Sequence, residues 1–160
     1  YFAYATRGAV AKIFSTMLPL GTKAKNFNLL DVTTKKEITY LDIKGEQGTL
    51  IFFICNHCPY VTHIIDEIIR ISNDYRVQGI GFVAISSNDF EKYPDDGPKK
   101  MEDFAFEKNF PFNYLIDESQ EIAKIYEAAC TPDFYLFDND DKLVYRGQLD
   151  DSRPGNNKMQ

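Results

Sequence analysis

The sequence contains no tryptophan, only three cysteines and only two histidines in 160 residues. Three cysteines cannot build a scaffold of several disulfides. Two histidines without a second cysteine pair cannot complete a tetrahedral zinc site, so we expect no metal. No apolar run approaches the ~18 residues of a membrane-spanning helix. The net charge of −6 also argues against nucleic acid as a partner, since phosphate binding requires a basic surface.

What the chain does contain is a Cys-x-x-Cys motif, Cys55-Asn56-His57-Cys58-Pro59, where one expected element ends and another begins. The apolar, β-branched and aromatic residues before it predict a buried strand over 49–54. Proline suits the first turn of a helix, and the isoleucines that follow recur with helical spacing, which predicts a helix over 59–76. Two thiols three residues apart at a helix N-terminus can close a disulfide, and the helix dipole there favours a thiolate. The motif therefore indicates thiol–disulfide chemistry.

The rest of the chain predicts alternating strands and helices. Capping at Asp117 or Ser119 starts the last expected helix, with Ile122, Ile125 and Tyr126 facing inward. The other elements expected are a helix at 9–17, a hairpin at 26–44 around a turn at 33–36, a strand at 80–86, a surface loop at 88–99, a helix at 99–108, a strand at 112–116, a helix ending at 128, and a hairpin of strands 134–137 and 143–145. Strand–helix alternation followed by a hairpin means an α/β fold with a mixed sheet.

Six stretches of the sequence resemble the thioredoxin-like, peroxiredoxin-like branch that includes the alkyl hydroperoxide reductase and thiol-specific antioxidant proteins. They are Leu18-Pro19-Leu20-Gly21, Phe27-Asn28-Leu29, residues 55–61, residues 82–89, Cys130-Thr131-Pro132-Asp133 and residues 145–156. The resemblance implies a thioredoxin fold: a mixed central sheet flanked by helices, an N-terminal hairpin, and an inserted helix and strand between about 88 and 117. The chain length predicts one domain, over 18–160, and the small residues near the N-terminus suggest that 1–17 is a leader or an expression-derived segment.

The same resemblance assigns roles around the cysteine pair. Pro132 is expected to be a cis-proline facing the two thiols, and Thr131 to offer backbone hydrogen bonds to a bound peptide or mixed disulfide. Two positions depart from the family pattern: Ile54 replaces the usual tryptophan before the first cysteine, and Thr49 replaces the buried acid that accepts a proton from the second thiol.

For an oxidoreductase we expect Cys55 to be the exposed nucleophile and Cys58 the thiol that resolves the mixed disulfide. His57 would stabilise the Cys55 thiolate, with Asn56 and Pro59 as supporting residues. The redox-active disulfide would be the only redox group, without a cofactor. Substrates would be disulfide-containing proteins or small thiols or peroxides. The electron donor stays open, as does the compartment, cytoplasmic or exported.

Two other hypotheses for the function remain open. In a peroxiredoxin-like thiol peroxidase, Cys58 would be the peroxidatic cysteine, and Arg146 would replace the missing arginine that stabilises the leaving oxygen. Asn88 is a further auxiliary candidate. Alternatively, the chain is a binding module with an inert disulfide. In every case Cys130 is expected to be a buried free thiol that points away from the pair.

The C-terminal sequence predicts an incomplete cover for the sheet. Residues 148–160 contain Pro154, Gly155 and two asparagines and cannot form a helix of useful length, so the C-terminal helix of the fold is expected to be absent. One apolar face of strands 134–138 and 142–147 should then be bare. Such a patch marks an interface, which predicts a homo-oligomer unless residues 1–17 cover it.

Overall fold

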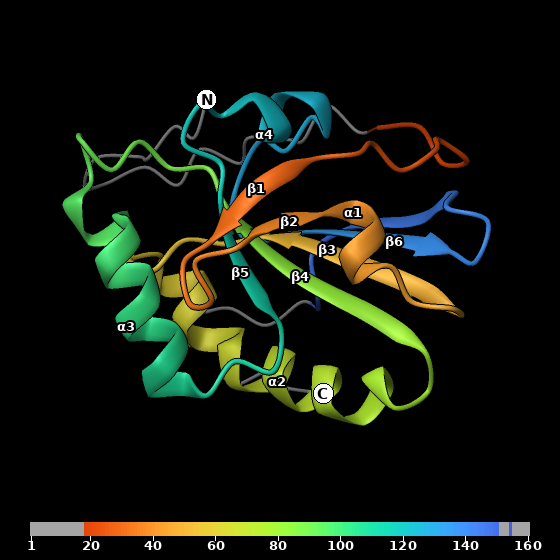
Figure 1. The fold of residues 1–160 in the computed structure, drawn as a ribbon, viewed down its shortest axis with the longest axis horizontal. Helices are drawn as coiled ribbons and strands as arrows, with labels where there is room; N and C mark the ends of the chain where they lie inside the picture. Colours follow the sequence, from red (N-terminus) through yellow and green to blue (C-terminus); the bar gives the residue numbers. More distant parts are fainter. Residues whose placement is uncertain (1–17, 151–153, 155–160) are drawn as a thin grey trace.

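The computed structural model describes residues 18–150 and 154 and contains one mixed sheet of seven strands (Figure 1). The strand order is β2-β1-β5-β4-β3-β6-β7. Strands β3, β4 and β5 run parallel, and the other neighbouring pairs are antiparallel. The strands are β1 Asn28–Asp31, β2 Glu37–Thr39, β3 Gly48–Phe53, β4 Ile80–Ser86, β5 Asn113–Ile116, β6 Asp133–Asp138 and β7 Leu143–Gly147.

Helices cover both faces of this sheet, which confirms the α/β thioredoxin-type architecture (Figure 1). One apolar cluster joins the sheet to α2 and α3, and the other joins it to α1 and α4. The helices are α1 Tyr40–Ile43, α2 Pro59–Arg76, the short 3-10 turn η1 Pro94–Asp96, α3 Pro98–Lys108 and α4 Glu121–Ile125. In the described part of the chain, no helix is both long and apolar enough to cross a membrane.

Strand β3 lies inside the sheet and supplies side chains to both layers. Phe52 contributes to the cluster under α2 and α3, whereas Ile51 and Phe53 contribute to the cluster on the opposite face. This alternation follows from the two-residue period of a strand. All three side chains are fully buried, so the strand that leads to the cysteine motif is fixed from both sides.

The helix at 59–76 and the strand at 80–86 have the predicted bounds. The helix expected to end at 128 is wrong in length, because α4 covers only Glu121–Ile125. Gln120 and Glu127, which flank it, both have positive φ, at 61° and 56°. A helix requires negative φ, so the backbone ends it at both sides. Ile125 is consequently 45% exposed instead of facing inward.

The hairpin predicted over 26–44 forms, but its second arm ends early. Strands β1 and β2 pair antiparallel, with Leu29 opposite Ile38. Tyr40, expected in the strand, begins α1 instead. The Asp42 carboxylate accepts a hydrogen bond from the Thr39 backbone N–H at 2.8 Å, as in a capping box. This local interaction favours a helical turn over a longer strand.

The expected bare face on the last two strands is largely absent. Tyr135, Phe137 and Leu143 are buried in the same cluster as residues of α1 and α4. Among the described residues of these strands, large exposed apolar side chains are limited to Val144 and Tyr145. The short helices thus cover more of the sheet than the sequence indicated. The helix expected at 9–17, the leader assignment and the ends of the C-terminal stretch lie outside the described residues.

Candidate active site

The cysteine motif lies where β3 ends and α2 begins. Cys55 follows the strand by two residues, Cys58 is the residue that caps the N-terminus of α2, and Pro59 is the first residue of that helix. Proline is tolerated there because the first helical N–H has no partner within the helix. The predicted strand-to-helix context of the motif is therefore confirmed.

Both thiols of the motif are buried, with Cys55 at 0% and Cys58 at 4% relative exposure. The expectation that Cys55 is the exposed sulfur is wrong. The chain folds so that strand β3, helix α2 and the segment around η1 all pack against the motif. Neither cysteine is in a disulfide in this structure.

Thr131 contacts both sulfurs, although more than 70 residues separate it from them. The Cys55 Sγ lies 3.3 Å from the Thr131 hydroxyl oxygen, and the Cys58 thiol donates to the Thr131 carbonyl oxygen at 3.7 Å. The peptide bond from Thr131 to Pro132 is cis. The structure thus brings the Cys-x-x-Cys motif and the Thr-Pro segment into one site.

Asp96 is a site residue that sequence reasoning missed. It lies in η1 and is 1% exposed. Its carboxylate accepts a hydrogen bond from the Asn56 backbone N–H at 2.9 Å and one from the Asn88 side-chain amide at 2.7 Å. No local pattern separates it from its exposed neighbour Asp95, so no signal in the sequence predicts that one carboxylate of this polar loop folds inward.

His57 lies close to both the Asp96 carboxylate and the Cys55 sulfur. Its Nδ1 contacts the Asp96 carboxylate, and its ring stacks on Tyr93 with centroids 5.2 Å apart and an interplanar angle of 18°. The sulfur of Cys55, one ring nitrogen of His57 and one carboxylate oxygen of Asp96 all lie within 4.8 Å of one another. A thiol, an imidazole and a buried carboxylate are therefore assembled in one cluster.

Asn56 holds the motif to the sheet and to the η1 segment. Its side-chain oxygen accepts a hydrogen bond from the Tyr114 hydroxyl at 2.8 Å, and its side-chain nitrogen donates to the Asp95 carbonyl at 2.9 Å. Desolvation, followed by the charges of Cys55 and Asp96, raises the pKa of Tyr114 well above its ordinary value. The phenol therefore keeps its proton and remains a donor to Asn56.

The two auxiliary candidates differ in outcome. The structure brings Asn88 to the site, where it is 4% exposed and donates to Asp96. It does not bring Arg146 to the cysteines: within the described residues, Arg146 forms no hydrogen bond or ion pair with either one, and its Nε is buried without a partner. The peroxidase hypothesis thus lacks the contact between an arginine and the peroxidatic cysteine that it requires.

The model of the AhpC/TSA family matches residues 20–146, which is most of the chain. The chain belongs to the AhpC/TSA family. No curated protein matches it. Among solved structures, an uncharacterized conserved protein from Geobacillus kaustophilus is 53% identical over 91% of this chain and 77% of that chain, with a TM-score of 0.89. A hypothetical protein from Sinorhizobium meliloti is 41% identical over 91% of this chain and 79% of its own, with a TM-score of 0.87.

A more distant structure shows the fold alone. The thioredoxin domain of a thiol-disulfide oxidoreductase from Bacteroides vulgatus is 16% identical, covers 82% of this chain and 89% of that one, and has a TM-score of 0.69. The family and this architecture support a thioredoxin-like redox role for the AhpC/TSA protein described here.

Cys130 of this AhpC/TSA protein is exposed, which corrects the expectation of a buried thiol. It lies between the end of α4 and the start of β6. Although the residue as a whole is exposed, partial burial of its thiol, then the negative charges of Asp133 and Cys58, raise the pKa of Cys130 to about 11. The thiol is therefore protonated, and a poor nucleophile, at neutral pH.

Asp133 carries a buried carboxyl group at the start of β6, three residues after Cys130. It is 3% exposed, pairs with Phe53 at the end of β3, and accepts a hydrogen bond from the Tyr135 hydroxyl at 3.0 Å. Burial raises its pKa to about 7, against hydrogen bonds from Tyr135 and from the backbone of Ala129 and Phe134 that lower it. Asp133 thus titrates near neutral pH in the folded protein.

This titration predicts a pH-dependent stability. The folded state keeps the Asp133 proton up to about pH 7, whereas the unfolded chain releases it near pH 4. Between these values the folded state binds more protons, so stability falls as pH rises. Relative to Asp133→Asn, the wild type should lose roughly 2–4 kcal/mol of unfolding free energy from pH 4 to pH 7.5, measured by urea denaturation. In the control variant Asp140→Asn, at an exposed position, the unfolding free energy should fall with pH as in the wild type. If the unfolding free energy of Asp133→Asn also fell as steeply as that of the wild type, the titration of Asp133 would not be the cause.

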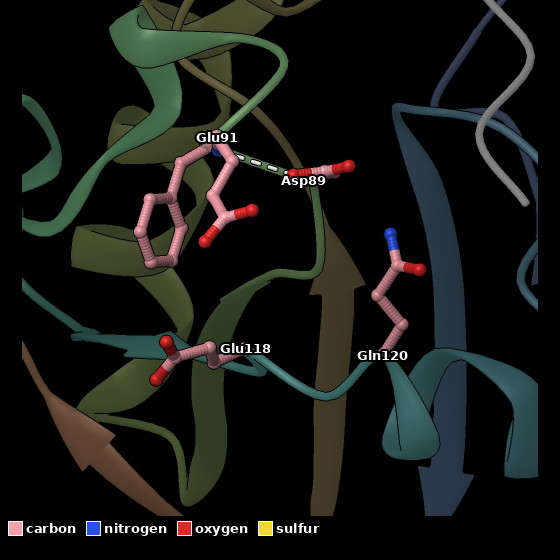
Figure 2. Close-up of a pocket in the computed structure, with 5 residues that line it drawn as sticks. Asp89, Glu91, Glu118 and Gln120 are labelled. Carbon is pink, nitrogen blue, oxygen red and sulfur yellow. Dashed lines mark hydrogen bonds between the residues drawn. The ribbon is translucent and has the colours of Figure 1, made fainter.

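An acidic pocket of 260 Å³ lies beyond the ends of β4 and β5 (Figure 2). Its lining residues are Asp89, Phe90, Glu91, Glu118 and Gln120. The Asp89 carboxylate accepts a hydrogen bond from the Glu91 backbone N–H at 3.1 Å (Figure 2). The lining contains neither a cysteine nor any of the residues that contact the two thiols, so this pocket is separate from the redox cluster.

Proposed function

We propose that this protein is a thiol–disulfide oxidoreductase in which Cys55 and Cys58 form the redox pair. The observation that carries the proposal is the contact of both sulfurs with Thr131. A threonine held against two thiols places a hydroxyl and a carbonyl where a mixed disulfide would form. The substrate would be a disulfide in a protein or a small molecule.

The exchange proceeds in two steps. The Cys55 thiolate attacks one sulfur of the substrate disulfide, which forms a mixed disulfide, and the other substrate sulfur leaves as a thiolate and takes up a proton. The deprotonated Cys58 then attacks the Cys55 sulfur and releases the second substrate thiol. The enzyme gives up two electrons and two protons, and the substrate disulfide takes up both. Oxidation of a substrate dithiol is the reverse sequence.

The choice of Cys55 as nucleophile rests on its surroundings rather than on its exposure. It lies in the cluster with His57 and Asp96 and next to the Thr131 hydroxyl. An imidazole next to a cysteine can stabilise its thiolate, and the Asp96 carboxylate, which contacts the Nδ1 of His57, orients that ring. Asp96 thereby brings an acid to the motif from the inserted segment, whereas Thr49 carries no acid and accepts a hydrogen bond from the Gly45 N–H at 3.1 Å.

The burial of Cys55 has a consequence for exchange. A substrate sulfur must approach the Cys55 sulfur along the S–S axis, and a side chain with 0% exposure offers no such approach. Exchange therefore requires local opening of the site.

Two assays run side by side test the function. With dithiothreitol as reductant, the protein should accelerate reduction of insulin disulfides, and peroxide consumption should stay at the background rate. Peptide mapping after oxidation should find a disulfide between Cys55 and Cys58. We also expect a reduction potential above the ~−270 mV of thioredoxin, because His57 stabilises the thiolate of the reduced form. Catalysed peroxide consumption with sulfenic acid at Cys58 would instead support the peroxidase.

A further inference from the structure

The cluster of Cys55, His57 and Asp96 combines a sulfur, a ring nitrogen and a carboxylate oxygen within 4.8 Å of one another. These are the three donor types that zinc uses in proteins. We propose that the reduced protein binds one Zn²⁺ ion at Cys55, His57 and Asp96. This inference goes beyond thiol–disulfide exchange and does not depend on it.

The distances suit such an ion after small shifts. Zinc bonds of about 2.0–2.3 Å in a tetrahedral arrangement place neighbouring ligand atoms roughly 3.3–3.7 Å apart. The three atoms lie within 4.8 Å of one another, but the Nδ1 of His57 is in direct contact with the Asp96 carboxylate, closer than two ligands of one ion. The His57 ring is partly exposed, so it can rotate away while the buried carboxylate stays fixed. Three protein ligands leave a fourth position for water or for a small thiol.

A second observation at Asn88 supports a cation at this place. Its side-chain nitrogen donates to the Asp96 carboxylate at 2.7 Å, which orients the carboxylate as partners of metal ligands do. Its side-chain oxygen is buried and has no hydrogen-bond partner among the described residues. A buried unpaired oxygen normally has an explanation, and a metal-bound water is a donor that would satisfy it.

Among the described residues, the sulfur of Cys58 does not belong to this cluster. The proposed site therefore differs from a chelate in which both thiols of the motif bind the ion. A thiolate is the zinc ligand, so binding to the Cys55 thiol releases its proton to solvent. A disulfide between Cys55 and Cys58 removes the thiolate ligand. The oxidised protein therefore does not bind the ion, and Zn²⁺ blocks attack by Cys55 in the reduced protein.

The test is metal binding by the full chain under anaerobic, reducing conditions. Zn²⁺ is titrated in competition with a chromophoric chelator, and Co²⁺ serves as a spectroscopic probe. We expect one ion per chain and a near-ultraviolet thiolate-to-cobalt absorption band. Cys55→Ser, His57→Gln and Asp96→Asn should each weaken Zn²⁺ binding by about 10-fold or more. Cys58→Ser should retain it within about 3-fold, and Cys130→Ser and His63→Gln are matched controls.

Three results would overturn the proposal: no binding by the reduced wild type, equal loss in Cys58→Ser and Cys55→Ser, or unchanged binding in both His57→Gln and Asp96→Asn. The second indicates a dithiol chelate instead. Because Asp96 accepts a backbone hydrogen bond from Asn56, circular dichroism checks the fold of Asp96→Asn. If that variant is unfolded, His57→Gln decides the outcome. The readout uses the metal alone, so it is independent of the insulin assay.

Discussion

Cys55→Ser should lower the rate of disulfide exchange by about 10³-fold or more, because a serine hydroxyl is not ionised near neutral pH and cannot form the mixed disulfide. Cys58→Ser should lose turnover to a similar extent but retain the first step. With the resolving thiol removed, the mixed disulfide between Cys55 and the substrate should accumulate and be detectable by intact-protein mass spectrometry. The two variants thus separate attack from resolution.

Cys130→Ser is the matched control, since it removes a thiol that is exposed and whose pKa is raised to about 11. Its activity should remain within about 2-fold of the wild type. The opposite pattern, in which Cys55→Ser accumulates a mixed disulfide at Cys58, would make Cys58 the nucleophile. Such a result would fit the slightly greater exposure of Cys58 and would reverse the roles assigned here.

Phe52→Ala should destabilise the protein by about 3–5 kcal/mol. Phe52 lies on β3 three residues before Cys55 and is fully buried. Its ring packs edge-on against Phe112 with centroids 5.0 Å apart and stacks on Phe134 at 5.7 Å. Truncation leaves a cavity between three elements that cannot all move inward, so the cavity cost adds to the lost burial. Urea denaturation under reducing conditions measures the change.

Phe106→Ala removes the same atoms from a side chain of α3 that is 61% exposed, and it should change stability by less than about 1 kcal/mol. Comparable losses in the two phenylalanine variants would mean that the central core is not what stabilises the fold. A selective loss in Phe52→Ala with unchanged exchange activity in the folded fraction would show that β3 acts through stability rather than chemistry.

The elements that could be predicted are those whose sequence pattern matches their environment. Helix α2 has a proline start and an apolar stripe, and β4 is a continuous apolar run. Helix α4 was predicted too long because Ile125 continues the helical pattern, whereas the left-handed backbone at Gln120 and Glu127 depends on how the chain must turn there. The buried carboxylate at Asp117, which accepts a hydrogen bond from the Ala123 N–H at 3.0 Å, is part of that tertiary arrangement.

The fold class and the position of the two cysteines at the start of a long helix can be read from the amino-acid sequence, because apolar periodicity and a short motif are local properties. The surroundings of the sulfurs depend on the three-dimensional packing instead. It buried Cys55, exposed Cys130, left Arg146 without contact to the pair and placed Asp96 beside His57. The physical reason is that solvent exposure and charge pairing depend on which distant segments share a strand end. That choice is made by the packing of the whole sheet and leaves no pattern in the neighbouring residues.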